Sequence, residues 1–361
     1  MHKNQTATGD PMWVATGHAE IRNLLCDERL GRSHPNPETA ARVNDAALFG
    51  PMGNFETEVS DHARMRSILQ PQFSARTMGK LRPRVSALTS ELFDTLTDRP
   101  MPVDLIAAVA VPLPVLVLCE LLGVPGEDRE QFGAWIQQAW DAGDGERAAQ
   151  GQAALFTYLS ELATERQANP TDDVLSRIAT TEGVHAFEAA ALSMATLFAG
   201  RETMVNAISV GVSTLLETPD RWSRLVAEPT LVPGAVEEFL RAPGQPDAGL
   251  VRYARTDMDV DGATVCQGDL VLLDVNTANL DPEVFPEPER FDMTRQSSAH
   301  LTFGHGLRYC IGAPLARIEL QELFAQLISR FPDMRLAVPV ADLRRQDDVV
   351  PGALVELPVT W

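Results

Sequence analysis

The sequence predicts a mainly helical fold with small β-sheets near both ends of the chain. Apolar residues at the helical period dominate residues 19–240 and return after residue 312. Alternating segments rich in β-branched residues occur at residues 5–16, at 250–274 and in the tail 334–361. With 361 residues, 45% of them hydrophobic and 22% charged, the chain is long enough to bury a large core. It contains no repeat and no linker-like stretch, so we expect a single domain over residues 1–361.

A hairpin over residues 5–16 is expected first, because Gly9, Asp10 and Pro11 form a turn signal between two short strand-like stretches. Helices predicted from the helical period then cover residues 19–26, 61–70, 80–96, 111–122, 128–139, 152–166, 186–216, 219–227 and 231–240. Strands are predicted at residues 250–254, 257–261, 264–265 and 270–274. A last helix is expected to begin near Gly312 and to end before Phe331, and the tail then indicates strands, with a hairpin at residues 349–359.

The composition restricts the possible partners and locations. A net charge of −20 excludes nucleic acid as an expected partner, because phosphate binding requires a basic surface. The first residues contain no apolar signal segment, and no run of eighteen uncharged apolar residues occurs, so we expect a cytoplasmic protein without a membrane span. Residues 62–89 differ from this acidic background, because they carry six cations and no carboxylate. The six are Arg64, Arg66, Arg76, Lys80, Arg82 and Arg84.

The longest predicted helix, residues 186–216, is apolar on nearly every face, which indicates a helix buried through the domain. Gly200, Arg201, Glu202 and Thr203 interrupt this pattern at mid-length. An interior glycine costs roughly 1 kcal/mol relative to alanine, and a buried carboxylate is costly unless it is paired. Two interpretations are open: a kink with a satisfied ion pair, or a distorted helix that faces a cofactor, where a carboxylate and a hydroxyl handle protons.

Of the four cysteines, only Cys310 lies in an informative context. The segment 303–314 contains three glycines within nine residues, which predicts a tight, non-repetitive backbone, and Pro314 suits the first turn of a following helix. Cys310 is therefore expected just before a helix N-terminus, where backbone N–H groups stabilise an anionic sulfur. The residues alone leave three roles open for Cys310: a structural cysteine, a nucleophile with His305 as its base, or a metal ligand.

The same segment resembles the haem-binding loop of the cytochrome P-450 family, F-x-x-G-x-R-x-C-x-G. It matches this motif at Phe303, Gly306, Arg308, Cys310 and Gly312. Four further segments resemble family signatures and occur in the expected order: 62–66 (H-x-x-x-R of bacterial members), 199–203 (the oxygen-activation motif), 238–241 (E-x-x-R) and 288–291 (the segment of its second arginine). Each short motif is weak alone, but five in order over residues 61–317 are specific. The sequence is therefore similar to soluble bacterial cytochromes P-450.

The resemblance implies the cytochrome P-450 fold, with haem b between the long central helix and the loop of Cys310 and the last helix. It implies that Cys310 is the axial ligand of the haem iron, with Phe303 beside the sulfur and Gly312 in the same loop. Two haem propionates entering a protein interior need charged donors. The side chains that match propionate-binding positions of the family are His62, Arg66, Arg252 and Arg308.

The resemblance also implies roles for the central helix. Glu202 and Thr203 deliver protons during oxygen activation, and Gly200 lets the helix open beside the haem. A buried salt-bridge network is implied for Glu238, Arg241 and Arg290, with a role in structure and haem loading.

The activity implied is that of a monooxygenase, which hydroxylates or epoxidises a bulky apolar small molecule. We expect the substrate to be a bacterial secondary metabolite such as a polyketide, macrolide or terpenoid. Electrons are expected from NAD(P)H through a ferredoxin reductase and a ferredoxin, for which the basic stretch 64–84 suits an acidic donor. The enzyme is expected to be a monomer. Substrate contacts are expected at Leu192, Ala195, Thr196, Ala199, Ala248, Leu250 and Ala353, with Asp141 and Asp247 as candidate polar contacts.

Several alternatives stay open. Oxidative ring closure or coupling uses the same site, and a peroxide-driven enzyme or a haem-bound ligand carrier or sensor is expected to lack Glu202 and Thr203. The chain also departs from the family pattern. The helix usually found before the first hairpin is missing, and Arg201 and Met204 stand where His and Thr are more frequent, so Arg201 is expected to alter proton delivery or to bind an anionic substrate group.

Overall fold

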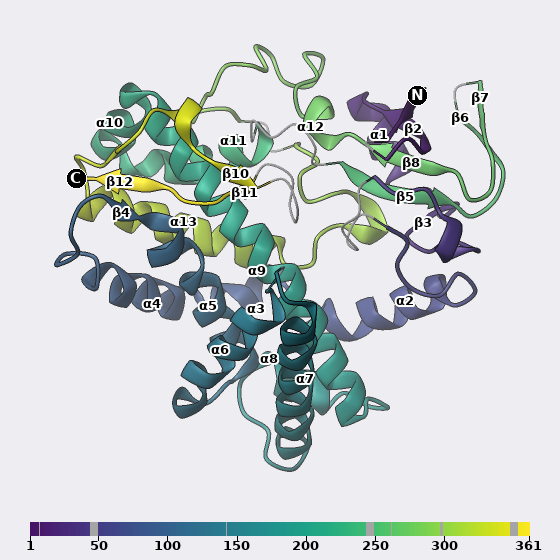
Figure 1. Ribbon diagram of the computed structural model, residues 1–361, viewed down its shortest axis with the longest axis horizontal. Coiled ribbons are helices and arrows are strands. Elements are labelled where there is room, and N and C mark those ends of the chain that lie inside the picture. The colour runs from purple at the N-terminus through teal and green to yellow at the C-terminus, as the bar shows by residue number, and fades with distance from the viewer. Residues whose placement is uncertain are drawn as a thin grey trace. The chain divides into compact units, whose positions relative to one another are not determined.

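The computed structural model describes residues 1–6, 8–43, 50–141, 143–242, 249–260, 262–296, 299–346 and 353–361 (Figure 1). The chain divides into two compact units, each built from segments that are far apart in the sequence. The first unit comprises Met1–Arg64, Pro233–Cys310 and Arg345–Ala353. The second comprises Met65–Val232, Ile311–Arg344 and Leu354–Trp361. The expectation of a single domain stays a prediction.

The first unit is built around a five-stranded sheet with the strand order β1-β2-β8-β5-β3. β1 (His2–Gln5) and β2 (Pro11–Ala15) form the predicted N-terminal hairpin, and Gly9 adopts a φ of 88° in its turn. β2 pairs in parallel with β8 (Leu270–Leu273), which pairs antiparallel with β5 (Leu250–Ala254). β3 (Leu30–Gly31) forms the other edge. β5 is important for the site, because it carries Arg252 opposite Val271.

Short helices cover this sheet. The helix α1 (His18–Leu24) buries Ile21 and Leu24 in a core that also includes Val271 and Leu273 of β8. α12 (Val275–Ala278) continues directly from β8, and α11 (Val232–Arg241) carries the buried pair Glu238 and Arg241. The strands β6 (Met258–Val260) and β7 (Ala263–Val265) form a separate hairpin.

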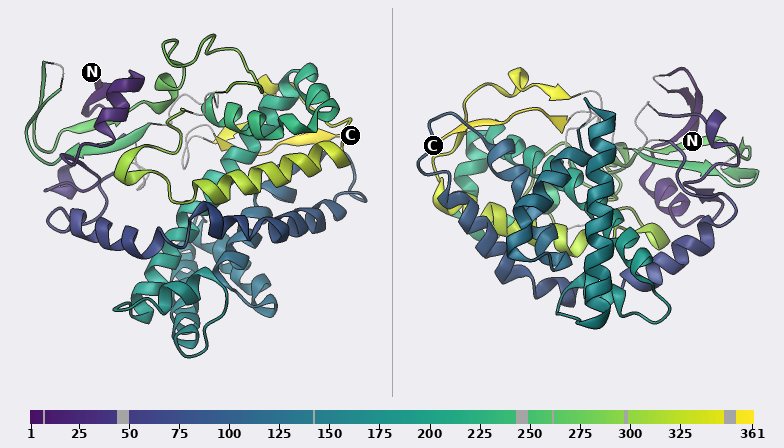
Figure 2. Two further views of the ribbon diagram at one scale, coloured as in Figure 1. Left: turned by 180° about the vertical axis from the view of Figure 1, so that it is seen from behind. Right: turned by 60° about the horizontal axis from the view of Figure 1, so that its bottom comes forward.

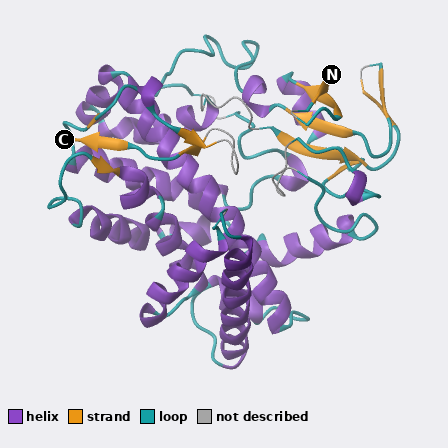
Figure 3. Cartoon of the chain, in the orientation of Figure 1, coloured by secondary structure: helices purple, strands orange, loops and turns teal. Residues whose placement is uncertain are grey.

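The second unit is mainly helical (Figure 3). Its longest helix is α9 (Ala186–Glu217), of 32 residues, which packs against α5 (Pro112–Leu122) and α7 (Gly145–Ala168) (Figure 2). The remaining helices are α2 (Glu58–Leu69, which begins in the first unit), α3 (Ala75–Gly79), α4 (Arg82–Asp94), α6 (Arg129–Ala139), α8 (Val174–Ala179), α10 (Pro219–Ala227) and α13 (Ala313–Arg330). Among the residues that the structure describes, no helix combines the length and apolar character that a membrane crossing needs.

The predicted helical class is confirmed, and the main differences concern short elements. α9 continues through Gly200 as the predicted single helix, and a kink or distortion at Gly200 stays a prediction. The hydroxyl of Thr203 donates to the carbonyl of Ala199 at 2.7 Å, a bond that the helical backbone accommodates. The helical period does not predict α3, α8 and α12, which are too short for a periodic signal. Each starts at a capping side chain, namely Ser74, Asp173 and Asp274.

The C-terminal tail pairs differently from the prediction. β12 (Pro358–Thr360) forms a three-stranded sheet with β4 (Val103–Asp104) and β9 (Arg335–Leu336), and β11 (Ala353–Leu354) pairs with β10 (Arg345–Gln346). The hairpin predicted at residues 349–359 is therefore wrong in its pairing, and residues 347–352 lie outside the described residues. Alternation predicts a strand but not its partner, which here comes from elsewhere in the chain.

Candidate functional site

Cys310 ends an irregular loop of the first unit. Gly304 and Gly306 adopt φ angles of 71° and 67°, which favour glycine, and a short 3-10 turn, Gly306–Arg308, follows. The N–H of Cys310 donates to the carbonyl of Phe303 at 2.7 Å, so the loop closes on itself and leaves the thiol exposed. Gly312 is the residue before α13, as the glycine and proline pattern predicts.

The surroundings of this loop explain two of its residues. A Cβ on Gly306 would lie 2.7 Å from the sulfur of Cys26, so no larger residue fits there without movement. Phe303 is half-buried, and its ring lies 5.9 Å from the ring of His300 and 6.4 Å from that of Tyr309. His305 accepts a hydrogen bond at Nε2 from Nε of Arg22 at 3.2 Å. This contact occupies one of the two ring nitrogens of His305.

Arginines gather on β5 and next to the loop of Cys310. Arg252 is 6% exposed, and its guanidinium donates to the carbonyl of Val251 at 2.8 Å. Desolvation, together with the positive charges of Arg32 and Arg308, lowers the pKa of Arg252 to about 9. No carboxylate of the described residues forms an ion pair with Arg252. A buried arginine of this kind is costly unless an anion binds beside it.

Glu58, at the start of α2, provides one negative charge to this group. Its carboxylate accepts from the N–H groups of Arg32 and Ser33 at 2.7 and 3.0 Å, and from the Ser33 hydroxyl. It also pairs with Arg255 at 3.0 Å and with Arg308 at 2.5 Å. These hydrogen bonds and the charge of Arg308 lower the pKa of Glu58 to about 2, although burial acts in the opposite direction. We call Arg32, Arg252, Arg255 and Arg308 the arginine cluster.

Two members of this group are predictable from the sequence, and the others are not. Arg252 and Arg308 match family positions, but Glu58, Arg32 and Arg255 match no motif and come from three separate segments. A signal for Glu58 was present, because it precedes His62 by four residues and so shares its helix face. His62 and Arg66 are half-buried, four residues apart on α2. Arg66 belongs to the second unit, and His62, Arg252 and Arg308 belong to the first.

In the second unit, the middle of α9 carries a row of exposed residues. Ala195, Ala199 and Thr203 are exposed at the helical spacing of four, and Phe198 beside them is 38% exposed. Ala195 and Ala199 have short side chains, so this face of α9 is exposed and small in profile. Leu192 is buried and therefore lies off this row.

The residues that flank the exposed row are held by internal contacts. Thr196 is half-buried and donates its hydroxyl to the carbonyl of Leu192 at 2.9 Å. A Cβ on Gly200 would lie 3.0 Å from the side chain of Leu118, so α5 packs closely at this point.

Arg201 connects the candidate acid Glu202 to an aromatic pair. The guanidinium lies 5.2 Å from the ring centroid of Trp140, which stacks on Phe198 at 4.4 Å, and it forms an ion pair with Glu202. Burial lowers the pKa of Arg201. Its Nε is buried without a hydrogen-bond partner among the described residues. Trp140 lies immediately after α6, at the start of a segment, residues 140–152, that the family resemblance implies to face the substrate.

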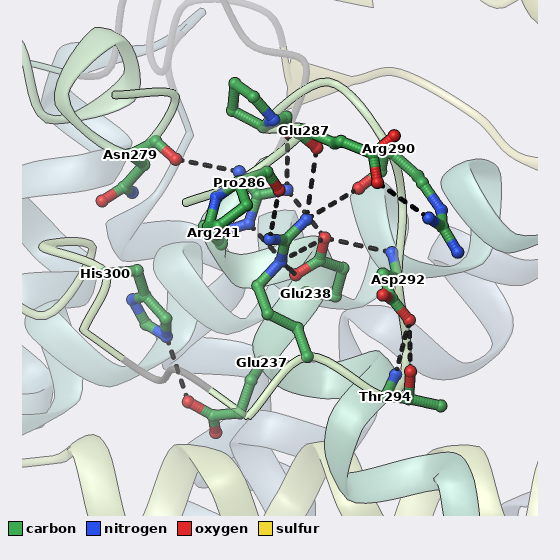
Figure 4. Close-up of polar contacts among 12 residues, drawn as sticks. Glu237, Glu238, Arg241, Asn279, Pro286, Glu287, Arg290, Asp292, Thr294 and His300 are labelled. Atoms are coloured by element: carbon green, nitrogen blue, oxygen red, sulfur yellow. Dashed lines mark hydrogen bonds and ion pairs between the residues drawn. The ribbon is translucent and has the colours of Figure 1, made fainter. Parts of the chain in front are cut away.

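A buried ion network surrounds Glu238 on α11 (Figure 4). Arg241 donates to both carboxylate oxygens at 3.0 and 2.7 Å, and Arg295 donates from Nε to both at 3.3 and 3.1 Å. The prediction of Arg290 as the second arginine is wrong. Arg290 is 62% exposed and pairs with Glu287 at 2.9 Å (Figure 4). Arg295, five residues after Arg290, pairs with Glu238 instead, and Glu287 between α12 and Arg290 adopts a φ of 50°.

The remaining predicted substrate contacts are only partly described. Leu250 and Ala353 are half-buried, whereas Ala248 and Asp247 lie outside the described residues. Asp141 forms an ion pair with Arg147 at 3.4 Å, which gives this carboxylate a partner within the chain.

Comparisons with known proteins agree on one family. The family model described as "Cytochrome P450" (written P-450 here) matches residues 152–334. Pentalenolactone synthase of Streptomyces exfoliatus is 39% identical over 98% of this chain and 91% of its own length. The monooxygenase PikC of Streptomyces venezuelae is 36% identical over 100% of this chain and 88% of its own length.

The solved structures give the same result for the fold. The X-ray structure of substrate-free PimD, described as a polyene macrolide antibiotic pimaricin epoxidase, has a TM-score of 0.91 and 37% identity, and covers 100% of this chain and 92% of that one. This level of sequence and fold similarity extends over nearly the whole of both chains. The chain therefore belongs to the cytochrome P-450 family of haem-dependent monooxygenases.

Proposed function

We propose that Cys310 binds the iron of haem b and that Arg252 and Arg308 bind its propionates. The described residues of the first unit fit such a group. Cys310 offers an exposed thiol at the end of a glycine-shaped loop. Arg252, a buried cation paired with no carboxylate of the described residues, carries the proposal, because it requires an anion. His62 and Arg66 are proposed as further propionate ligands.

When bound, this group supplies the reductive activation of dioxygen, which electron donation by a thiolate ligand favours. The chain contributes the proton donors. We propose that Glu202 accepts protons from solvent at its carboxylate and releases them to water held at Thr203 Oγ1. Thr203 is exposed on the row of α9, and its hydrogen bond to Ala199 fixes the position of the hydroxyl. Arg201 forms an ion pair with Glu202 and so holds the position of this carboxylate.

The proposed reaction inserts one oxygen atom of dioxygen into a C–H or C=C bond of a bulky apolar molecule. The short side chains of Ala195 and Ala199, with Phe198 exposed beside them, suit an apolar ligand. The relatives that are named for pentalenolactone and pimaricin support a secondary metabolite as substrate, of the polyketide, macrolide or terpenoid type. Oxidative ring closure or coupling is the second candidate. The carrier or sensor role is disfavoured because Glu202 and Thr203 are both present.

Electrons are proposed to come from NAD(P)H through a ferredoxin reductase and a ferredoxin in the cytoplasm, with the enzyme as a monomer. The structure refines the basic stretch that is proposed to dock the acidic donor. Arg82 pairs with Glu322 at 2.6 Å and Arg84 with Glu120 at 3.0 Å, so internal carboxylates offset both charges. Arg76 and Lys80 are exposed and are the better candidates for contact with a donor.

Turnover with heavy-isotope dioxygen tests the proposal. Candidate ligands are first selected by the shift that they induce in the haem absorption of the purified enzyme. Selected ligands are then incubated with ferredoxin, reductase and NADPH. One labelled oxygen atom in the product supports the monooxygenase reaction, and a cyclised or coupled product without label supports the second candidate. Tight binding without NADPH consumption would contradict both and favour a carrier.

A further inference from the structure

Glu58 forms ion pairs with two arginines of the cluster, Arg255 and Arg308, whose charges a single carboxylate does not balance. Arg255 has other partners: it donates to the Ser33 hydroxyl at 3.1 Å and to the Phe55 carbonyl at 2.7 Å, and its guanidinium lies 4.5 Å from the Phe55 ring. For Arg308, Glu58 is the sole ion-pair partner in the part of the chain that the structure describes. Glu58 is therefore more important to Arg308 than to Arg255.

Arg252 and Glu58 interact through the same cluster. The charges of Arg32 and Arg308 both disfavour the charged form of Arg252, and the charge of Glu58 favours it. Glu58 is itself 6% exposed, so water screens these interactions little. Without Glu58, the buried cations would repel one another. Uncompensated buried charges are among the causes of the largest losses of folding stability from a single substitution.

We propose that Glu58 is the chain's own counter-ion for the arginine cluster and keeps the cluster folded until the haem carboxylates bind to the same arginines. The inference rests on the proposed function, because it requires a group with two carboxylates at Arg252 and Arg308. If Glu58 and the haem carboxylates compensate the same positive charges, the loss of Glu58 lowers the stability of the haem-free chain strongly and that of the haem-loaded chain only slightly. A carboxylate with a purely structural role would matter equally in both states.

The test compares the full-length chain with and without haem, as wild type, Glu58→Gln and Glu56→Gln. Glutamine keeps the size of the side chain and removes its charge, and Glu56 is an exposed carboxylate of the same segment that serves as the matched control. Urea unfolding is followed by tryptophan fluorescence. We expect Glu58→Gln to raise the unfolding equilibrium constant of the haem-free chain roughly a hundredfold or more, and that of the haem-loaded chain about tenfold at most. Glu56→Gln should change neither.

Glu58→Asp provides a second variant, because it keeps the charge on a shorter side chain. It should recover most of the stability that Glu58→Gln loses in the haem-free chain. A haem-free Glu58→Gln chain that does not fold, next to a haem-loaded one that does, is the limiting form of the expected result. Equal losses in the two states would overturn the inference, and so would a haem-loaded Glu58→Gln chain that fails to fold. A wild-type chain that is unfolded without haem would overturn it as well, since Glu58 would then hold no folded cluster.

Failure of the proposed function is recognised separately. If the wild-type chain showed no thiolate-ligated haem spectrum, the error would lie in the assignment of Cys310, before any variant of Glu58 is compared.

Discussion

Replacing Arg295 by methionine removes the second arginine of the Glu238 network and keeps an apolar side chain of similar length. The loss can be worked from the contacts. Arg295 donates to both oxygens of Glu238, and also to the carbonyls of Pro286 at 2.8 Å and Arg290 at 3.1 Å. Its side chain is 11% exposed. Breaking a buried ion pair lowers the free energy of unfolding by about 3–5 kcal/mol. Because Arg241 still pairs with Glu238, we expect a loss of about 3 kcal/mol for Arg295→Met.

Arg290→Met is the matched control. Arg290 is 62% exposed and pairs with an exposed glutamate, so its loss should cost about 0–1 kcal/mol. Thermal unfolding of the two haem-loaded variants measures the difference. A loss of about 3 kcal/mol lowers the midpoint by roughly 5 °C in a chain of this size. If Arg290→Met lowered the midpoint as much as Arg295→Met, or if Arg295→Met left it unchanged, the assignment of the network would be refuted.

Three further predictions follow from other parts of the structure. Thr203→Ala should keep the haem but divert electrons to hydrogen peroxide, measured as peroxide per NADPH; wild-type coupling in this variant would contradict the proton role of Thr203. Gly306→Ala should destabilise the loop by about 1–3 kcal/mol, because residue 306 has a φ of 67° and its Cβ would meet the sulfur of Cys26. The haem content after purification measures this loss. Cys26→Ala is the control, because it removes the sulfur at the contact and leaves the backbone of residue 306 unchanged. Finally, the pKa of Glu58 falls in the fold from 4.5 to about 2, so its stabilisation is present above pH 4.5 and is lost as pH falls towards 2. The free energy of unfolding should therefore fall less steeply with decreasing pH in Glu58→Gln than in the wild type over this range. An equal slope in the two proteins would contradict the assignment of Glu58.

The parts of the fold and site that the sequence predicted depend on local signals. Three glycines and Pro314 identify the loop of Cys310 and the start of α13, and the period of apolar residues identifies α9 from Ala186 onward. These features arise from residues close together in the chain. Gly200 lies inside α9, which continues through it as one helix, and the exposed hydroxyl of Thr203 donates to the carbonyl of Ala199 one turn earlier.

The parts that the sequence did not predict depend on the path of the chain between elements. Arg290 and Arg295 are equivalent by type, and the path of the chain after α12 brings Arg295 and not Arg290 to Glu238. Glu58 collects donors from residues 32, 33, 255 and 308, which no short motif links. Ion-pair partners of this kind are tertiary facts, and they become visible only in the folded chain.

The absorption spectrum of the reduced, carbon monoxide-bound protein tests the central claim most directly. It should be recorded for the wild type and for Cys310→Ala, with Cys26→Ala as a control cysteine that is also exposed. We predict the red-shifted Soret band of thiolate ligation in the wild type and in Cys26→Ala, and its loss in Cys310→Ala. A wild type without this band, or a Cys310→Ala variant that keeps it, would contradict the account.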